Sequence, residues 1–231
     1  PSRYPYLLES PSSGPNGRFD ILFGFPGERL EVTATTGLQI DGHKLGGHFL
    51  DQLHSRIDGE SIATTELDAL SIPFTGGWFV YLGYEMAQEI EPTLINLPAD
   101  EFLPAAVAQR MPLGIVVDRI NDMTTIIADP AASFEQLTTS LRDLQQKSGA
   151  FESQQNKLTR MHEESSDIYL AAVEQAKNYI RDGDIFQANL SRRWRGQFAQ
   201  PVNPHQLYAD LKTSNPAPFA GLALLANEIA I

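Results

Sequence analysis

Alternating apolar and polar residues predict β-strands through the first half of the chain. Two apolar-rich runs, residues 19–25 and 29–35, flank the turn-forming pair at Pro26 and Gly27, which predicts a β-hairpin. A second hairpin is predicted over residues 113–129, with its turn at Asn121-Asp122. These patterns indicate antiparallel pairing in the N-terminal part of the chain.

Apolar residues three and four positions apart predict three helices. The first covers residues 47–57, and the second begins after Ser133, a residue type that caps helix N-termini. The third is predicted from Ser166 onward. Gly183 stands where a left-handed C-cap is expected for this third helix.

After Gly183 the period changes to two, which predicts a strand over residues 185–195. Gln187, Asn189 and Ser191 share one face of this strand. The face is either the solvated side of an antiparallel sheet or a wet cleft, because Asn is depleted in strands. Spacing alone favours the solvated side.

Hairpins combined with flanking helices predict an α+β fold with antiparallel sheets. The stretch after the second helix is polar and has no periodicity, which predicts an exposed linker. The predicted organisation is an N-terminal region over residues 1–147, a linker over residues 148–164 and a second region over residues 165–231.

Composition narrows the function classes. The 231 residues carry a formal net charge of −12, which disfavours nucleic acid and anionic membrane surfaces as partners. The absence of cysteine excludes disulfides and thiol nucleophiles. No apolar run approaches the roughly 20 residues of a membrane span, so a cytoplasmic protein is expected. The spacing of the histidines predicts no metal site, and the residues alone offer no complete catalytic constellation.

Four ordered motifs resemble those of the chorismate-utilising enzymes. The segment "GDIFQANLSRR" is similar to a G-D-[IC]-[FY]-Q-x-x-L-[SA]-x-R motif shared by anthranilate synthase component I, aminodeoxychorismate synthase component I and the isochorismate and salicylate synthases. The segments are residues 183–193, "YPYLLES" with "GRFDIL" at 4–10 and 17–22, "IPFTGGWFVYLGYE" at 72–85, and "NPAPFAG" at 215–221.

The resemblance implies two large sheets packed face to face, with helices outside them. The N-terminal motifs are similar to those of the two synthases that aminate chorismate with ammonia from a glutamine amidotransferase subunit. Between these two, "GRFDIL" favours aminodeoxychorismate synthase component I, on the route to p-aminobenzoate and folate. Anthranilate synthase component I, on the tryptophan route, stays open as an alternative and more often has serine where Asp20 stands.

The same resemblance implies that the catalytic motifs lie beyond Ile231. S-P-E, P-I-K-G-T, the histidine motif and the glutamates that bind Mg²⁺ are absent from the 231 residues. The chain is therefore expected to be the N-terminal part of the enzyme, inactive by itself and without a catalytic or metal-binding residue. The alternative, from another class, is a non-catalytic module that binds a small molecule and docks the amidotransferase.

The resemblance also implies a pocket for one molecule of L-tryptophan. Phe19 and Phe219 would enclose the indole, Arg18 would pair with the carboxylate, and Ser10 would hold a polar end. From spacing alone, the two phenylalanines are equally well explained as core residues. The expected pocket residues are Ser10, Asn16, Gly17, Arg18, Phe19, Pro218, Phe219 and Ala220.

Overall fold

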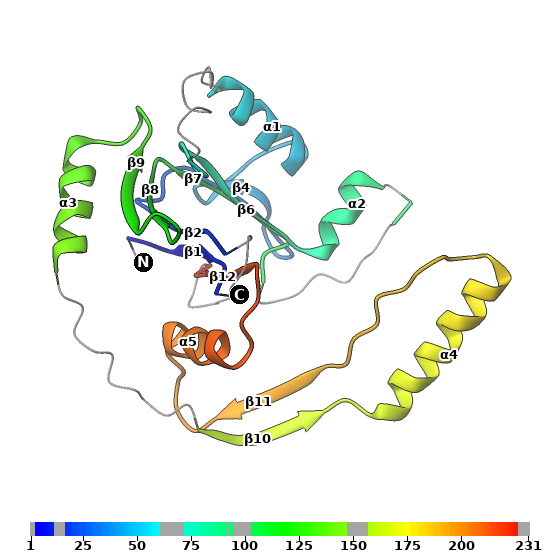
Figure 1. Cartoon of the computed structure of the whole chain (residues 1–231). Coiled ribbons are helices and arrows are strands. Elements are labelled where there is room, and N and C mark those ends of the chain that lie inside the picture. The colour runs from blue at the N-terminus through cyan, green and yellow to red at the C-terminus, as the bar shows by residue number, and fades with distance from the viewer. Residues whose placement is uncertain are drawn as a thin grey trace. The chain divides into compact units, whose positions relative to one another are not determined.

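The structure, a computed structural model, describes residues 3–11, 17–60, 72–91, 93–94, 103–146 and 157–225. It divides into two compact units, the first comprising Pro1–Ala150 with Tyr208–Ile231 and the second Phe151–Leu207 (Figure 1). Within the described ranges, no helix is long and apolar enough to cross a membrane.

The described part of the first unit contains two five-stranded antiparallel sheets (Figure 1). In the first sheet the order is β12-β1-β2-β8-β9, and in the second it is β5-β4-β3-β7-β6. The strands of the first sheet are β1 (Tyr6–Glu9), β2 (Phe19–Gly24), β8 (Leu113–Asp118), β9 (Met123–Ala128) and β12 (Ala220–Ala223). Those of the second are β3 (Arg29–Thr33), β4 (Gly37–Ile40), β5 (His43–Lys44), β6 (Gly77–Leu82) and β7 (Ala106–Met111).

The two sheets pack face to face around an apolar core. Tyr6 and Phe23 of the first sheet meet Val107 and Met111 of the second, and all four side chains are buried. The ring of Tyr6 stacks on that of Phe79, with the centroids 3.8 Å apart. This packing confirms the α+β prediction with antiparallel sheets.

Helices cover the outer faces of the sandwich. Helix α1 (Phe49–Gly59) places Phe49 and Leu53 against the second sheet, in a core cluster with Leu30. The short elements η2 (Tyr84–Met86) and α2 (Ala87–Ile90) follow β6. Helix α3 (Phe134–Gln145) lies against β9, and its N-terminus is closed by a capping box between Ser133 and Gln136.

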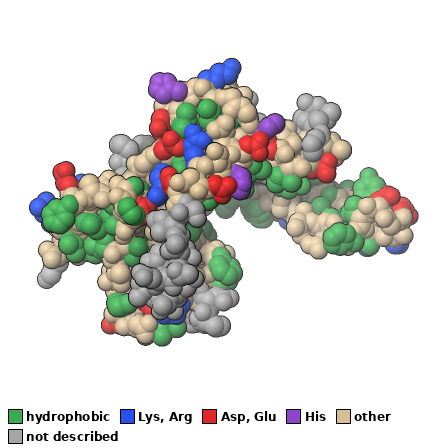
Figure 2. Space-filling view, turned by 90° about the horizontal axis from the view of Figure 1, so that it is seen from above, with side chains coloured by type: hydrophobic (Ala, Val, Ile, Leu, Met, Phe, Trp, Pro, Cys, Tyr) green, Lys and Arg blue, Asp and Glu red, His purple; other side chains and the backbone are tan. Residues whose placement is uncertain are grey.

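The described part of the second unit contains β10 (Leu158–Glu163), α4 (Ser166–Asp182) and β11 (Trp194–Phe198), and β10 pairs with β11. A further helix, α5 (Pro204–Ser214), begins in this unit and continues into the first. No residue from 157 to 207 is buried. Apolar side chains lie on the surface of α4, at the right of Figure 2, and Ile168 is 62% exposed.

The structure confirms the three predicted helices and the hairpin of β8 and β9, whose turn contains Asp122 at φ 48°. The first predicted hairpin is wrong. Strands β2 and β3 belong to different sheets, because the Pro26-Gly27 connection crosses between the sheets and the Gly27 N–H bonds to the Arg110 carbonyl at 2.8 Å.

The predicted strand over residues 185–195 is also wrong for most of its length. Pairing begins only at Trp194, and no described strand pairs with the segment that precedes it. Extended backbone becomes a strand only when a neighbour completes its hydrogen bonds. Of the predicted linker over residues 148–164, residues 148–156 lie outside the described residues, and β10 occupies residues 158–163.

Candidate functional site

The ends of β1 and β12 bring together two of the segments expected to form the tryptophan pocket. Glu9 pairs with Ala220 across the two strands, and Ser10 follows directly. The Ser10 hydroxyl, in a residue that is 8% exposed, donates a hydrogen bond to the carbonyl of Pro218. Strand pairing therefore joins residues that are about 200 positions apart in the sequence.

Arg18, the residue before β2, is held by Asp118 at the end of β8. Its Nε and Nη2 atoms donate to Asp118 Oδ2 at 3.1 and 2.8 Å, and its guanidinium lies 4.4 Å from the ring centroid of Phe19. The hydrogen bonds from Arg18, supported by those from Asn121, lower the pKa of Asp118. The arginine expected to meet a ligand carboxylate is thus paired with a carboxylate of the protein.

The two aromatic residues of the expected pocket do not enclose a common space. Phe19 lines a small cavity of about 80 Å³ together with Arg18 and Pro73, whereas Phe219 does not line it and is 82% exposed. Ordinary ligand pockets measure roughly 300–1,000 Å³. Gly17 lies two residues before β2, and Asn16 lies outside the described residues.

A network of charged side chains surrounds Ser10 on the side of α5. The carboxylate of Glu9 is buried, and Lys212 Nζ lies 2.9 Å from its Oε1 atom. Arg119 Nη2 is 2.7 Å from Asp20 Oδ2 and 3.7 Å from Glu9 Oε2. Arg119 Nη1 also donates to the Ser10 carbonyl at 2.9 Å, so the network fixes the backbone at the end of β1.

This network of charges was not predicted from the sequence. The pKa of the Tyr208 hydroxyl is raised, first by burial and then by the carboxylate of Glu9 beside it. Glu9 stands inside the "LLES" motif, so its position was visible, but its partners Lys212 and Arg119 belong to no motif. A buried carboxylate with two cations can orient a neighbouring polar ligand by charge.

A family profile described as "chorismate binding enzyme" matches residues 5–227. The chain belongs to the chorismate-binding enzyme family. Anthranilate synthase component 1 of Cereibacter sphaeroides is 34% identical over 239 residues, which cover 93% of this chain and 47% of that protein. The Thermus thermophilus protein of the same name is 27% identical, over 98% of this chain and 49% of that protein.

The fold of this chain is similar to the crystal structure of anthranilate synthase component I from Streptococcus pneumoniae. The TM-score is 0.67 at 25% identity, and the match covers 89% of this chain and 47% of the other. The chain thus spans about half the length of the relatives it matches.

The motif at residues 183–193 lies in the second unit of the chain. In the segment before β11, the side chains of Gln187, Asn189 and Ser191 are exposed. Gln187 Nε2 donates a hydrogen bond to Asn189 Oδ1 at 3.4 Å. The same described ranges contain no group of three or more His, Asp or Glu side chains that could hold a metal ion.

Proposed function

We propose that this chain is the N-terminal part of a component I enzyme that aminates chorismate with ammonia from a glutamine amidotransferase subunit. The observation that carries the proposal is the family match over residues 5–227. The names of the relatives, which are about twice as long, support the component I assignment. The absence of cysteine from the chain agrees with ammonia generation by a separate subunit.

The first candidate product is 4-amino-4-deoxychorismate. Its support is Asp20, at a position where the tryptophan-route enzymes that this chain resembles more often have serine. Asp20 pairs with Arg119 at 2.7 Å and so belongs to the network that fixes Ser10. Anthranilate is the second candidate, and the names of the relatives favour it.

Activity would require groups that the 231 residues do not supply. Amination of chorismate in this family is expected to use Mg²⁺, which stabilises developing negative charge on oxygen. We place the magnesium ligands beyond Ile231. The contribution of this chain would be the sandwich, the Ser10 end of β1 and part of the chorismate-binding domain.

The test is product analysis. The protein expressed from its gene through to the stop codon is incubated with chorismate, ammonium and Mg²⁺, and the products are separated by chromatography. Formation of 4-amino-4-deoxychorismate supports the first candidate, and anthranilate supports the second. The proposal would be contradicted if neither product were formed. It would also be contradicted by ammonia-dependent turnover of chorismate by the 231-residue chain alone.

We also propose that the Ser10 end of the sandwich binds L-tryptophan. The support is the contact between Ser10 and Pro218, which the expected pocket requires. Binding would need Phe219 to turn inward from its exposed position and the small cavity beside Phe19 to widen. Arg18 would have to divide its hydrogen bonds between Asp118 and the carboxylate of the ligand.

Calorimetry tests this second proposal. Ser10→Ala and Phe219→Ala are each expected to weaken L-tryptophan binding at least about tenfold, the equivalent of one lost hydrogen bond or aromatic contact. Phe186→Ala is the matched control, because Phe186 is also highly exposed, at 93%, but lies in the second unit. Absence of binding at millimolar tryptophan, or equal weakening in all three variants, would end the idea.

A further inference from the structure

Helix α3 leaves most of its apolar stripe in contact with solvent. The stripe consists of Phe134, Leu137, Leu141 and Leu144. The exposed fractions are 81% for Phe134, 52% for Leu141 and 46% for Leu144, whereas Leu137 is partly buried. Hydrophobic side chains accordingly gather over α3 at the left of Figure 2. A contiguous apolar stripe on a surface can mark a site of protein–protein contact.

The helix is attached to the first sheet through a different face. Ser140 is fully buried, and its hydroxyl donates to the Gln136 carbonyl within the helix at 2.9 Å. Asp143 accepts hydrogen bonds from the Tyr4 hydroxyl at 2.7 Å and from the Arg3 guanidinium at 2.6 Å. The burial of Ser140 and the polar contacts of Asp143 hold α3 in place, so its exposed apolar side chains are available to a partner.

The spacing of the stripe is the same in both directions along the helix. Its members are separated by three, four and three positions, the spacing that keeps apolar side chains on the shared side of a helix pair. A second copy of α3 laid antiparallel therefore sets Phe134 against Leu144 of the other copy, and Leu137 against Leu141. Such a contact is isologous, because both copies use the same surface about a two-fold axis.

Two charged side chains select the antiparallel orientation. Glu135 lies in the first turn of α3 and Arg142 in the last, and both are exposed. They are seven positions apart and so lie on the same side of the stripe. Within the described ranges neither forms a side-chain ion pair. An antiparallel copy places Glu135 opposite Arg142 of the other helix at both ends of the contact, whereas a parallel copy would place like charges together.

We propose that α3 is an interaction surface for a second copy of this chain, joined as an antiparallel helix pair. The proposal does not rest on the function proposed above, since its test uses neither chorismate nor ammonia. A helix of this length spans only about 18 Å, so its face is far smaller than the roughly 800 Å² per partner of a stable complex. The net charge of −12 on each copy also opposes association. The expected association is therefore reversible, with a dissociation constant in the high-micromolar to millimolar range.

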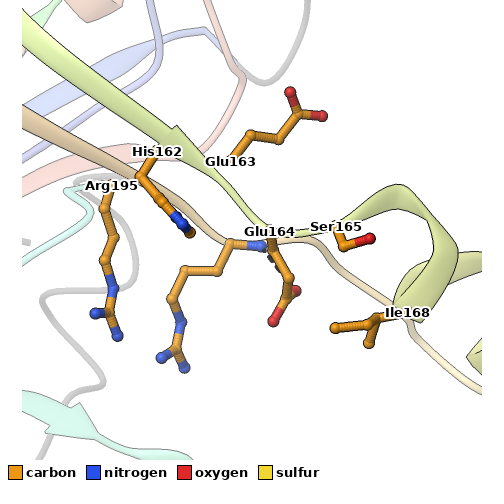
Figure 3. Close-up of a pocket in the computed structure, with 7 residues that line it drawn as sticks. His162, Glu163, Glu164, Ser165, Ile168 and Arg195 are labelled. Atoms are coloured by element: carbon orange, nitrogen blue, oxygen red, sulfur yellow. Dashed lines mark hydrogen bonds between the residues drawn. The ribbon is translucent and has the colours of Figure 1, made fainter.

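Sedimentation equilibrium of the 231-residue chain, from micromolar to millimolar concentration, measures this association. Leu141→Glu should weaken it at least about tenfold, because the contact would bury a carboxylate. Ile168→Glu is the matched control and should change it less than about twofold. Ile168 is also an exposed apolar residue, but it projects from the first turn of α4 beside an open hollow of the second unit (Figure 3).

Charge reversal tests the orientation of the two helices. Glu135→Arg and Arg142→Glu should each weaken association at least about fivefold, because each variant places like charges together at both ends of the pair. An equimolar mixture of the two variants should restore association to within about twofold of the wild type, since the mixed pair has opposite charges at both ends. Arg181→Glu, on α4, is the charge-matched control and should change association less than about twofold.

Amide hydrogen exchange locates the contact without relying on variants. Raising the protein concentration should slow exchange in α3 and leave α4 unchanged, because binding stabilises the part of the chain that it involves. The proposal is overturned if the chain stays monomeric at millimolar concentration or if mixing the two charge variants restores nothing. Concentration-dependent protection of α4 in place of α3 would assign the contact to the second unit and would also overturn it, as would equal weakening by Ile168→Glu.

Discussion

The two units of the chain are stabilised by different kinds of interaction. In the first unit, sheets and helices bury side chains from distant parts of the sequence, such as Tyr6 against Phe79 and Phe49 against Leu30. In the second unit no residue from 157 to 207 is buried. Its helix rests on local signals, the Ser165 cap and Gly183 in the left-handed region at φ 83°. Regular secondary structure therefore does not by itself indicate a stable core.

The largest expected effect comes from emptying the first unit's core. Phe49→Ala should lower the free energy of unfolding by about 3–5 kcal/mol, because the side chain is fully buried and its removal leaves a cavity. Ile168→Ala, on the exposed surface of α4, should change it by less than about 0.5 kcal/mol. Urea denaturation of both variants measures the difference, and equal losses would break the comparison.

Lysine-to-methionine changes sharpen the comparison at intermediate size. Lys212→Met leaves the buried Glu9 with Arg119 as its remaining cation, at 3.7 Å. The expected cost is about 1–3 kcal/mol, reduced from a fully buried pair because Lys212 is partly exposed.

Lys177→Met is the matched control, since it removes an exposed pair with Glu174 on α4. That change should cost at most about 0.5 kcal/mol. Both values come from urea denaturation at neutral pH. A cost for Lys177→Met as large as that for Lys212→Met would show that the second unit is held as firmly as the first.

The successes of sequence reasoning lie where structure is decided locally. The Ser133 cap and the turn at Asp122 depend on residues within four positions, and both were predicted. The β1–β12 pair and the contact of Glu9 with Lys212 join residues about 200 positions apart. No periodicity specifies such pairs, so the sequence analysis could not name the partners of Glu9.

The same reason explains why the first hairpin was wrong. Residues 19–25 and 29–35 have the pattern of paired strands, but the pattern cannot tell which neighbour each strand takes. The resemblance placed Ser10 and Pro218 in one pocket, and the structure brings the two residues into contact. A family motif can relate residues far apart in the sequence, which the spacing of residue types cannot. The resemblance did not predict that Arg18 would be paired with Asp118.

The smallest expected effect is a dependence of stability on acid. The pKa of Asp118 is lowered in the folded protein, mainly by Arg18, while the unfolded chain has an ordinary value near 3.9. The stability from this pair is therefore present above about pH 4 and is lost as the pH falls toward the folded pKa. Asp118→Asn should lose less stability than the wild type between about pH 4 and pH 2 in urea titrations.

The control for Asp118 is Glu174→Gln in the second unit. Lys177 lowers the pKa of Glu174, but both side chains are exposed and lie in the second unit. Glu174→Gln should therefore leave the acid dependence of the main unfolding transition unchanged. If Asp118→Asn and Glu174→Gln reduce the pH dependence of the free energy of unfolding equally, the partly buried Arg18–Asp118 pair contributes no more stability than the exposed pair.

Amide hydrogen exchange of the 231-residue chain without ligand tests the central claim most directly, because it reports opening segment by segment. We expect strong protection in β1, β2, β7 and β8, where the free energy of opening at each amide should approach the free energy of global unfolding. We expect weak protection in β10, α4 and β11, which contain no buried residue. Protection in α4 equal to that in β7 would contradict this claim.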